Sequence, residues 1–196
     1  MYQFIESICI RDQEPMLLDY HQKRLDRTFA SYYPPVKPHS IEKELNKCAI
    51  PSGLIKARLL YDSNEIHMEF ESYMPPKIDS LKVIESKIDY GFKFFDRTEL
   101  SLLHAERKEC DDILIVKNGW VTDSYFANCA FFKNGMWHTP DTFLLNGVKR
   151  NYLIDQGLIQ PSPISVNEIS KFEKVSLINA MLDLGQVEIF IENIHE

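Results

Sequence analysis

The sequence lacks the usual marks of an exported or membrane-bound protein. Its four cysteines, Cys9, Cys48, Cys110 and Cys129, form no C-x-x-C pair, and no N-x-S/T sequon occurs. Scattered thiols of this kind are typical of reduced, intracellular proteins. The first residues carry neither the basic start nor the apolar run of a signal peptide, and no apolar stretch reaches the roughly 18 residues of a membrane span. We therefore expect a soluble, cytoplasmic protein without membrane contact.

Concentrated charge and the common nucleotide and hydrolase motifs are also missing. The net charge is −7 and no block of like charge exceeds three residues, which argues against a nucleic-acid partner. Walker A, G-x-G-x-x-G and G-x-S-x-G patterns are absent. His104, Glu106 and Cys110 lie at helical spacings that give no convergent set of three ligands, so we expect no metal site.

The first part of the chain alternates one strand, two helices and further strands. FIESICI (residues 4–10) is rich in β-branched and aromatic residues, and residues 19–33 have helical spacing with Tyr20, Leu25 and Phe29 on one face. Ser40 is a good N-cap for a short helix. Residues 56–62 and 65–73 predict two strands, and 80–86 a third. These elements predict a small α+β domain over residues 1–88.

The second part predicts a larger domain over residues 89–196 that contains a β-meander. Residues 96–99 (DRTE) resemble a capping box that starts a helix reaching to about residue 108. Two Lys-Asn-Gly turns, at 117–119 and 133–135, each separate apolar alternating runs. A helix follows Asn146-Gly147. A short helix at 168–174 and strands at 175–181 and 186–194 complete this part.

Lys93 is the first candidate for chemistry. It lies in the run YGFKFF (residues 90–95), where four aromatic residues surround one lysine. A desolvated ammonium has a lowered pKa, and a neutral lysine amine can form a Schiff base. A lysine that snorkels from an apolar surface is the structural alternative, and the local run leaves both interpretations open.

Two charged residues and one glycine are further candidates. Asp123 follows the first predicted hairpin and is either a buried charge partner or a turn residue. Arg58 lies in the middle of a strand, on one face with Lys56 and Leu60, and requires an anion or a carboxylate as its partner. Gly147 precedes a helix whose first N–H groups form either a phosphate cradle or an ordinary helix start. In this order, a lysine, a carboxylate and a helix start suit a pyridoxal phosphate enzyme.

Seven segments in order resemble the class IV aminotransferase-like pyridoxal phosphate enzymes of fold type IV. This family includes branched-chain aminotransferases, D-amino acid aminotransferases and 4-amino-4-deoxychorismate lyases. The segments are FIESICI with Glu6, HQKRL, KARLLY, GFKFFDRTEL, DDILIVKNGWVTDSYFANCAFF, HTPDTFLLNGVKR and VSLINAM. The resemblance implies an α+β fold of two domains, a small α/β N-terminal domain and a larger barrel-like one. It also implies a homodimer that acts on a small amino acid-like substrate.

The resemblance assigns a role to each candidate. Lys93 would be the Schiff-base lysine and the general acid/base, and Asp123 would pair with the pyridine nitrogen. Asp123 stands where glutamate is usual, so the strand end must come closer or a water must bridge. Gly147 would let the backbone approach the cofactor. Asn128 and Arg150 match family positions for which we expect a structural role. Phosphate binding would fall to Arg58, the backbone of Val148 and Lys149, and Asn179 and Ala180.

The neighbourhood of the lysine favours one reaction within this family. KFFDR and INAM are similar to the corresponding segments of the lyases. We therefore expect 4-amino-4-deoxychorismate lyase activity, in which Lys93 takes the α-proton, pyruvate leaves and 4-aminobenzoate is released for folate synthesis. An amino acid aminotransferase of the D-amino acid or branched-chain type is the alternative. A catalytically silent homologue that acts as a binding subunit is the third hypothesis.

Overall fold

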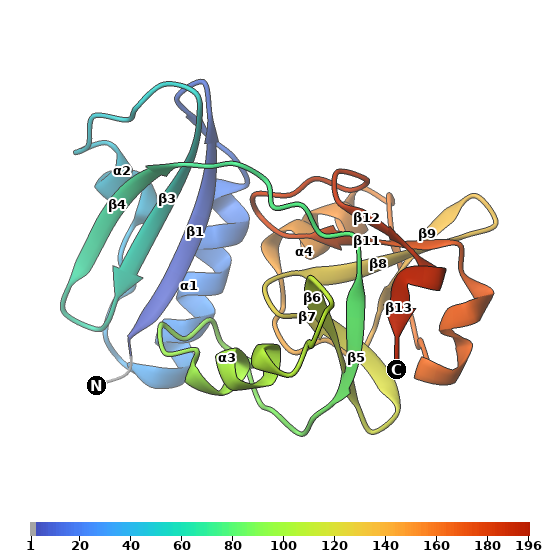
Figure 1. Ribbon diagram of the computed structural model, residues 1–196. Coiled ribbons are helices and arrows are strands. Elements are labelled where there is room, and N and C mark those ends of the chain that lie inside the picture. Colours follow the sequence, from blue (N-terminus) through green and yellow to red (C-terminus); the bar gives the residue numbers. More distant parts are fainter. Residues whose placement is uncertain (1–2) are drawn as a thin grey trace. The chain divides into compact units, whose positions relative to one another are not determined.

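The computed structural model describes residues 3–196, which divide into two compact units (Figure 1). Unit 1 comprises Met1–Met74 and Phe92–Asp96, and unit 2 comprises Pro75–Gly91 and Arg97–Glu196. The chain therefore leaves unit 1, returns to it for five residues around Lys93, and leaves it again. The division into domains 1–88 and 89–196 stays a prediction.

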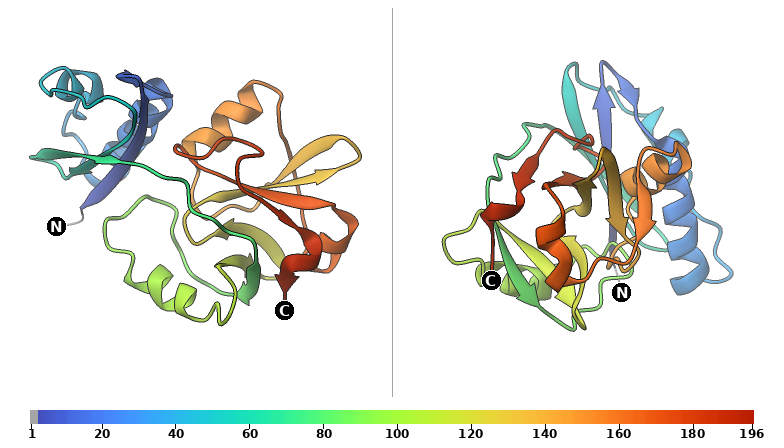
Figure 2. Two further views of the ribbon diagram at one scale, coloured as in Figure 1. Left: turned by 45° about the horizontal axis from the view of Figure 1, so that its top comes forward. Right: turned by 90° about the vertical axis from the view of Figure 1, so that its right-hand side faces the viewer.

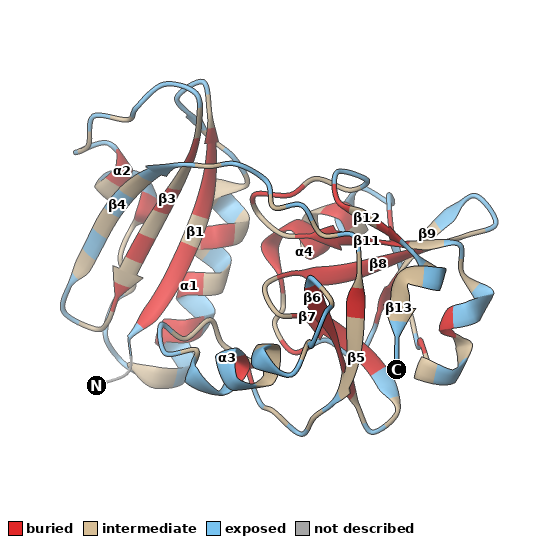
Figure 3. Cartoon of the chain, viewed as in Figure 1, coloured by how far each residue is buried: buried red, intermediate tan, exposed pale blue. Residues whose placement is uncertain are grey.

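Unit 1 is a four-stranded antiparallel sheet with two helices on one face (Figure 1, Figure 2). The strand order is β2-β1-β3-β4. The core between sheet and helices is apolar and includes Phe4, Phe29 and Tyr61 (Figure 3). The elements are β1 (Phe4–Arg11), β2 (Glu14–Pro15), α1 (Leu18–Tyr32), α2 (Ile41–Leu45), β3 (Leu54–Tyr61) and β4 (Ile66–Ser72).

The period-2 and cap predictions for unit 1 are confirmed, and the face predicted for α1 needs one correction. Along β3, buried residues alternate with half-buried ones, as the pattern predicts. The Ser40 side chain accepts a hydrogen bond from the backbone N–H of Lys43 and caps α2. On α1, Leu25 and Phe29 are buried but Tyr20 is only half-buried, and His21 takes its place on the buried face.

Unit 2 is built on one sheet of nine strands. The main path is β10-β9-β8-β7-β6-β5-β13, while β11 pairs with β8 and β12 pairs with β11. Strands β5 and β6 are parallel neighbours, and helix α3 lies between them in the chain. The elements are β5 (Leu81–Glu85), α3 (Thr98–Ala105), β6 (Asp112–Lys117), β7 (Trp120–Ser124), β8 (Asn128–Lys133), β9 (Met136–Pro140), α4 (Val148–Asp155), β10 (Gln160–Ser162), η1 (Val166–Lys171), β11 (Lys174–Ile178), β12 (Glu188–Phe190), η2 (Ile191–Asn193) and β13 (Ile194–His195).

The two predicted hairpins are present and explain the meander. Asn118 and Gly119 have φ angles of 54° and 78°, and Asn134 and Gly135 have 51° and 78°. Two successive residues with positive φ are typical of the type I′ turn, whose twist suits a two-residue hairpin. These turns join β6 to β7 and β8 to β9, and the α+β fold with a larger meander-containing part is confirmed.

Three predicted boundaries in unit 2 are wrong. Helix α3 has Arg97 in its N-cap position, without a capping hydrogen bond from that side chain, and it ends at Ala105. The helix predicted at 168–174 is a 3-10 helix, Val166–Lys171. The strand predicted at 186–194 is interrupted by η2, because only its first part pairs with β11 and its last part pairs with β5. No helix among residues 3–196 is both long enough and apolar enough to cross a membrane.

Candidate active site

Lys93 lies beside the first strand of unit 1. Its carbonyl oxygen accepts a hydrogen bond of 2.9 Å from the backbone N–H of Ile5, and Phe94 forms an isolated bridge with Phe4. The neighbouring aromatic residues are part of the core of unit 1. Phe94 lies 5.1 Å from Phe4 and Phe92 lies 4.9 Å from Tyr32, between ring centroids. Core packing in unit 1 therefore accounts for Phe92 and Phe94, whereas Phe95 is exposed and Tyr90 belongs to unit 2. The half-buried Lys93 is held at a fixed place along β1.

A buried charged cluster forms next to Lys93. The Glu6 carboxylate accepts bonds from Arg24 Nε at 2.8 Å and Nη2 at 2.6 Å, and Nδ1 of His21 lies 2.6 Å from it. Burial favours the neutral acid, but Arg24 and the hydrogen bonds outweigh it and lower the pKa of Glu6 to about 2. Burial lowers the pKa of His21, Glu6 opposes this, and the positive charges of Arg24 and Lys93 add to the lowering. His21 is therefore neutral at pH 7 and donates its Nδ1–H to Glu6.

Arg58 lies on a different part of unit 1. Alternation along β3 places it on the less buried face, with Lys56 and Leu60, as predicted. Its Nη1 donates to Oε2 of Glu69 on β4 at 3.3 Å, and both side chains are partly exposed. Arg58 therefore forms the ion pair with a carboxylate that was one of its two predicted roles. Its other predicted role, phosphate binding, stays a prediction.

Asp123 is a buried carboxylate at the end of the β6–β7 hairpin in unit 2. Its Oδ2 accepts from the backbone N–H of Leu145 and its Oδ1 from Nδ2 of Asn128, both at 2.9 Å. Burial raises the pKa of Asp123 to about 6, although these two bonds and the charge of Arg150 act in the opposite direction. Above this pH the side chain of Asp123 is a carboxylate, which can accept a hydrogen bond from a cationic ring nitrogen.

Gly147 occupies the N-cap position of α4. Its φ and ψ are −71° and 139°, which any residue can adopt, so the turn itself does not demand a glycine. A Cβ built on Gly147, however, would lie 1.8 Å from Oδ1 of Asn128. This position therefore has no room for a side chain, and the obstacle is another side chain of the protein. The predicted approach of the Gly147 backbone to the cofactor stays a prediction. No side chain caps α4, whose first turn begins at Val148.

The two charged side chains that follow Gly147, those of Lys149 and Arg150, are held by partners within unit 2. Lys149 Nζ donates to Oδ1 of Asp183 at 2.6 Å, with side chains 9% and 44% exposed. Arg150 is buried, donates to the carbonyl oxygen of Pro140 at 2.9 Å and stacks on the ring of Phe143 at 4.4 Å. Burial lowers the pKa of Arg150. Arg150 thus joins α4 to the end of β9, which agrees with the structural role expected for it.

Asn179 and Ala180 lie just beyond the end of β11. The Asn179 Oδ1 accepts bonds from the backbone N–H groups of Met181 and Leu182, at 2.8 and 3.0 Å. Its side chain therefore shapes its own turn, and the predicted phosphate contact of Asn179 and Ala180 stays a prediction. Because Asp183 follows this turn, the Lys149–Asp183 ion pair links the turn to the start of α4.

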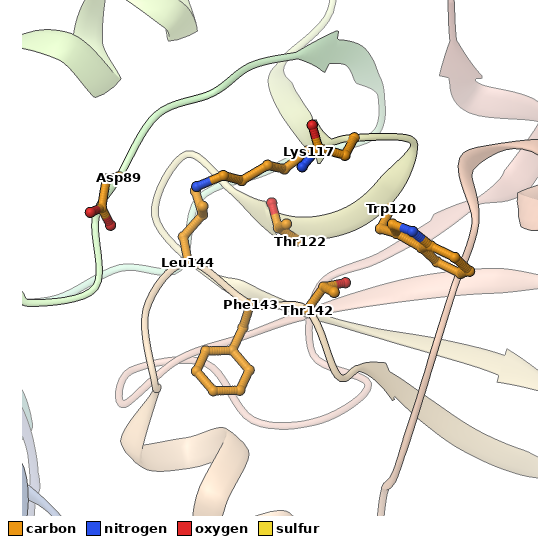
Figure 4. Close-up of a pocket in the computed structure, with 8 residues that line it drawn as sticks. Asp89, Lys117, Trp120, Thr122, Thr142, Phe143 and Leu144 are labelled. Atoms are coloured by element: carbon orange, nitrogen blue, oxygen red, sulfur yellow. The ribbon is translucent and has the colours of Figure 1, made fainter.

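Unit 2 also contains a pocket of about 250 Å³ that none of the predicted site residues lines (Figure 4). Three of its polar side chains bond to backbone: Lys117 donates to the carbonyl of Ile88, Thr122 to that of Ile115 and Thr142 to that of Val121. The pocket adjoins the Asp123 region through Leu144, whose backbone interacts with Asp123, and through Phe143, which packs on Arg150. Its lining residues are Asp89, Lys117, Asn118, Trp120, Thr122, Thr142, Phe143 and Leu144.

Comparison with known proteins shows which family the chain belongs to. The sequence model of the amino-transferase class IV family matches residues 3–189. The chain belongs to the class IV aminotransferase family. It is therefore an enzyme of a pyridoxal phosphate-dependent family, and its mixed α/β fold is that of the fold-type IV transaminases.

Relatives of this class IV chain cover nearly all of it. An uncharacterized protein of Haemophilus influenzae (strain Rd) is 32% identical over 185 residues, which are 92% of this chain and 98% of the relative. A crystal structure from Haemophilus somnus 129PT, described as a candidate 4-amino-4-deoxychorismate lyase, is 31% identical with a TM-score of 0.89. It covers 94% of this chain and 98% of its own. A fold IV transaminase from Curtobacterium pusillum, 16% identical over 96% and 78% of the two chains, has a TM-score of 0.75 and shares the fold.

The structure brings together some predicted site residues within each unit. In unit 2, Asn128 connects Asp123 to the loop before Gly147, and in unit 1 Lys93 lies by the Glu6 cluster while Arg58 does not. Glu6 and the HQKRL segment enter the predictions only as motifs of the resemblance. The buried charge network that Glu6 forms with His21 and Arg24 was not predicted. An acid inside the apolar strand FIESICI was the available signal, because a buried charge requires a partner.

Proposed function

We propose that this class IV enzyme is a 4-amino-4-deoxychorismate lyase that uses pyridoxal 5′-phosphate. The observation that carries the proposal is the 31% identity, over 94% of this chain, to the Haemophilus somnus protein described as a candidate for that activity. The lyase-like segments KFFDR and INAM agree with it. In the proposed pathway the product, 4-aminobenzoate, serves folate synthesis.

Each unit contains groups that suit this cofactor. A buried carboxylate, a helix start without a side-chain cap and a half-buried lysine are the kinds of group that its ring nitrogen, phosphate and aldehyde require. Lys93 would hold the aldehyde and Asp123 the ring nitrogen. The N–H groups of Val148 and Lys149 would hold the phosphate, together with the turn at Asn179 and Ala180.

An arginine is expected to complete the phosphate site, and the resemblance assigns this role to Arg58. Arg58 pairs with Glu69 on a partly exposed face. Arg24, by contrast, donates two hydrogen bonds to the buried Glu6 carboxylate and belongs to that cluster.

The proposed reaction needs one proton acceptor and a fixed negative charge. When bound, the cofactor supplies an electron sink for the carbon that bears the substrate amino group. Lys93 Nζ removes the proton from that carbon. The enolpyruvyl group leaves with the electron pair of the bond between its oxygen and the ring, and it becomes pyruvate after its methylene carbon takes up a proton, while the remaining ring becomes aromatic. Asp123, held by hydrogen bonds from Leu145 and Asn128, would keep the ring nitrogen of the cofactor cationic.

An amino acid aminotransferase is the second candidate, favoured by the shared fold with the Curtobacterium pusillum transaminase. There Lys93 would move the proton from Cα to the cofactor carbon instead of allowing elimination. A silent homologue that serves as a binding subunit is the third candidate, which the presence of Lys93 disfavours. In each case we propose a cytoplasmic homodimer with a small amino acid-like substrate.

The test uses visible absorption and product analysis on the purified chain with added pyridoxal phosphate. We expect an absorption band that is lost in Lys93→Ala and retained in Lys77→Ala, because Lys77 is an exposed lysine paired with Asp79. A colourless wild type overturns the cofactor proposal. With aminodeoxychorismate we expect equal amounts of pyruvate and 4-aminobenzoate. A keto acid formed only with a second amino donor identifies an aminotransferase, and a coloured protein without any turnover identifies the silent homologue.

A further inference from the structure

Asn128 stands at the start of β8, directly opposite Asp123 in the register of the sheet, and is buried. Its Nδ2 donates two hydrogen bonds of 2.9 Å, one to Oδ1 of Asp123 and one to the carbonyl oxygen of Leu145. Both partners are oxygens that can only accept, so the NH₂ group must face them. The amide oxygen of Asn128 therefore faces the other way, toward Gly147.

Three groups thus form a closed set of hydrogen bonds. Leu145 donates its N–H to Oδ2 of Asp123, Asn128 donates to Oδ1 of Asp123, and Asn128 also donates to the carbonyl of Leu145. Both carboxylate oxygens of Asp123 and both backbone polar groups of Leu145 are engaged. The orientation of the acid is consequently fixed relative to the loop that leads into α4.

The absence of a side chain at Gly147 leaves room for the Asn128 amide. An added Cβ would meet Oδ1 of Asn128 at 1.8 Å and its Cγ at 3.0 Å, while the backbone angles of Gly147 are permitted for every residue. The Asn128 amide cannot turn away without breaking its two bonds, because flipping it would set its oxygen against two acceptors. The glycine is therefore required by the asparagine, and any side chain at 147 would displace the group that holds Asp123.

We propose that Asn128 is a positioning residue that fixes Asp123 and the N-terminus of α4 at a set spacing, and that Gly147 is needed to accommodate it. The catalytic meaning of this role rests on the proposed function, because that function makes Asp123 the partner of the ring nitrogen and α4 the phosphate site. The spacing and the charge of Asp123 are properties of the chain itself. Arg150 and the Cys129 thiol are the other ionisable groups that interact with Asp123.

The first test is a thermal denaturation cycle with Gly147→Ala, Asn128→Ala and the double variant. We expect Gly147→Ala to lower the midpoint by about 10 °C in the wild type and by less than about 3 °C in the Asn128→Ala background. Gly91→Ala serves as the control, since a Cβ there would meet only Asp89 Oδ1 at 3.7 Å, and it should leave the midpoint nearly unchanged in both backgrounds. Equal costs of Gly147→Ala with and without Asn128 overturn the proposal.

The same cycle remains decisive where a variant fails to fold. If Gly147→Ala does not fold, folding of the double variant supports the proposal, and failure of the double variant while Asn128→Ala folds overturns it. If Asn128→Ala itself does not fold, Asn128→Ser becomes the background, because serine lacks the amide oxygen that a Cβ at 147 would strike and its hydroxyl can rotate away.

The second test follows the carboxyl of Asp123 by ¹³C NMR, assigned through its disappearance in Asp123→Asn. Asn128→Ala removes one donor to the ionised acid, so the pKa of Asp123 should rise above about 6 by about one pH unit. Gly147→Ala should produce the same rise. An unchanged pKa in Asn128→Ala overturns the proposal. Neither test requires turnover, so a failed positioning role is distinguishable from a failed lyase assignment.

Discussion

Asp112 offers a quantitative test of how burial acts on a carboxylate in unit 2. It is the first residue of β6, fully buried, and its Oδ1 accepts from the backbone N–H of Ile113 at 2.8 Å. Burial raises the pKa of Asp112 from 3.8 to about 6, although hydrogen bonds from Ile113 and Ser124 oppose the rise. The folded state therefore holds this proton more tightly than the unfolded state does.

The sign and size of the pH dependence follow from that difference. The contribution of Asp112 to stability is fully present below pH 3.8 and is lost as the pH rises through about 6. A difference of about two pH units, at about 1.4 kcal/mol each, amounts to about 3 kcal/mol. Asp112→Asn removes this loss. The stability of the variant relative to the wild type should therefore increase by about 3 kcal/mol between pH 4 and pH 8.

Urea denaturation at pH 4, 5, 6, 7 and 8, followed by tryptophan fluorescence, measures this difference. Asp111→Asn is the matched control. The neighbouring Asp111 is exposed and its pKa is lowered, chiefly by the backbone N–H of Asp79 and also by Ser80. The contribution of Asp111 to stability is present above pH 3.8 and is lost only as the pH falls below that value, so the difference for Asp111→Asn should stay nearly flat between pH 4 and pH 8. A flat or falling difference for Asp112→Asn would refute the inference that burial governs this carboxylate.

Three further substitutions test other ion pairs. Glu6→Gln leaves Arg24 without its countercharge and should lower the free energy of unfolding by about 3–5 kcal/mol in urea at pH 7; a loss below 1 kcal/mol would contradict a buried charge network. Lys149→Met breaks the pair with the partly exposed Asp183, so stability should fall by at most about 1 kcal/mol while pyridoxal phosphate binding, followed by fluorescence, weakens. Unchanged binding would show that this pair does not shape the phosphate site. Arg58→Met should likewise cost at most about 1 kcal/mol, and a tenfold weaker affinity for the cofactor would support its phosphate role.

Local patterns predicted the sheet elements well. The alternation in β3 and β4, and the two Lys-Asn-Gly hairpins, depend on residues within a few positions of one another. The Ser40 cap is equally local. Such signals survive folding because the period of side-chain direction and the sterics of a turn are fixed by the backbone itself.

Features that depend on distant partners were not predictable in the same way. Glu6 meets His21 and Arg24, which are 15 and 18 residues away, and no spacing in the sequence indicates that one acid serves both. The last strand was predicted as a single run because its residues alternate suitably. It is divided because its two ends pair with different strands, β11 and β5. This pairing depends on the arrangement of the whole sheet and not on the local sequence.

The three Asn-Gly pairs of the chain show that a local dipeptide predicts a turn in some places and not in others. At 118–119 and 134–135 both residues adopt positive φ and close hairpins, as the dipeptide predicts. At 146–147 the glycine has φ −71° and begins a helix. The dipeptide is identical, so intrinsic turn preference cannot explain the third case. The contact with Asn128 does explain it, because even a methyl group at 147 would strike the amide that holds Asp123. A glycine can thus be required by its neighbour in space where its own backbone would tolerate any residue.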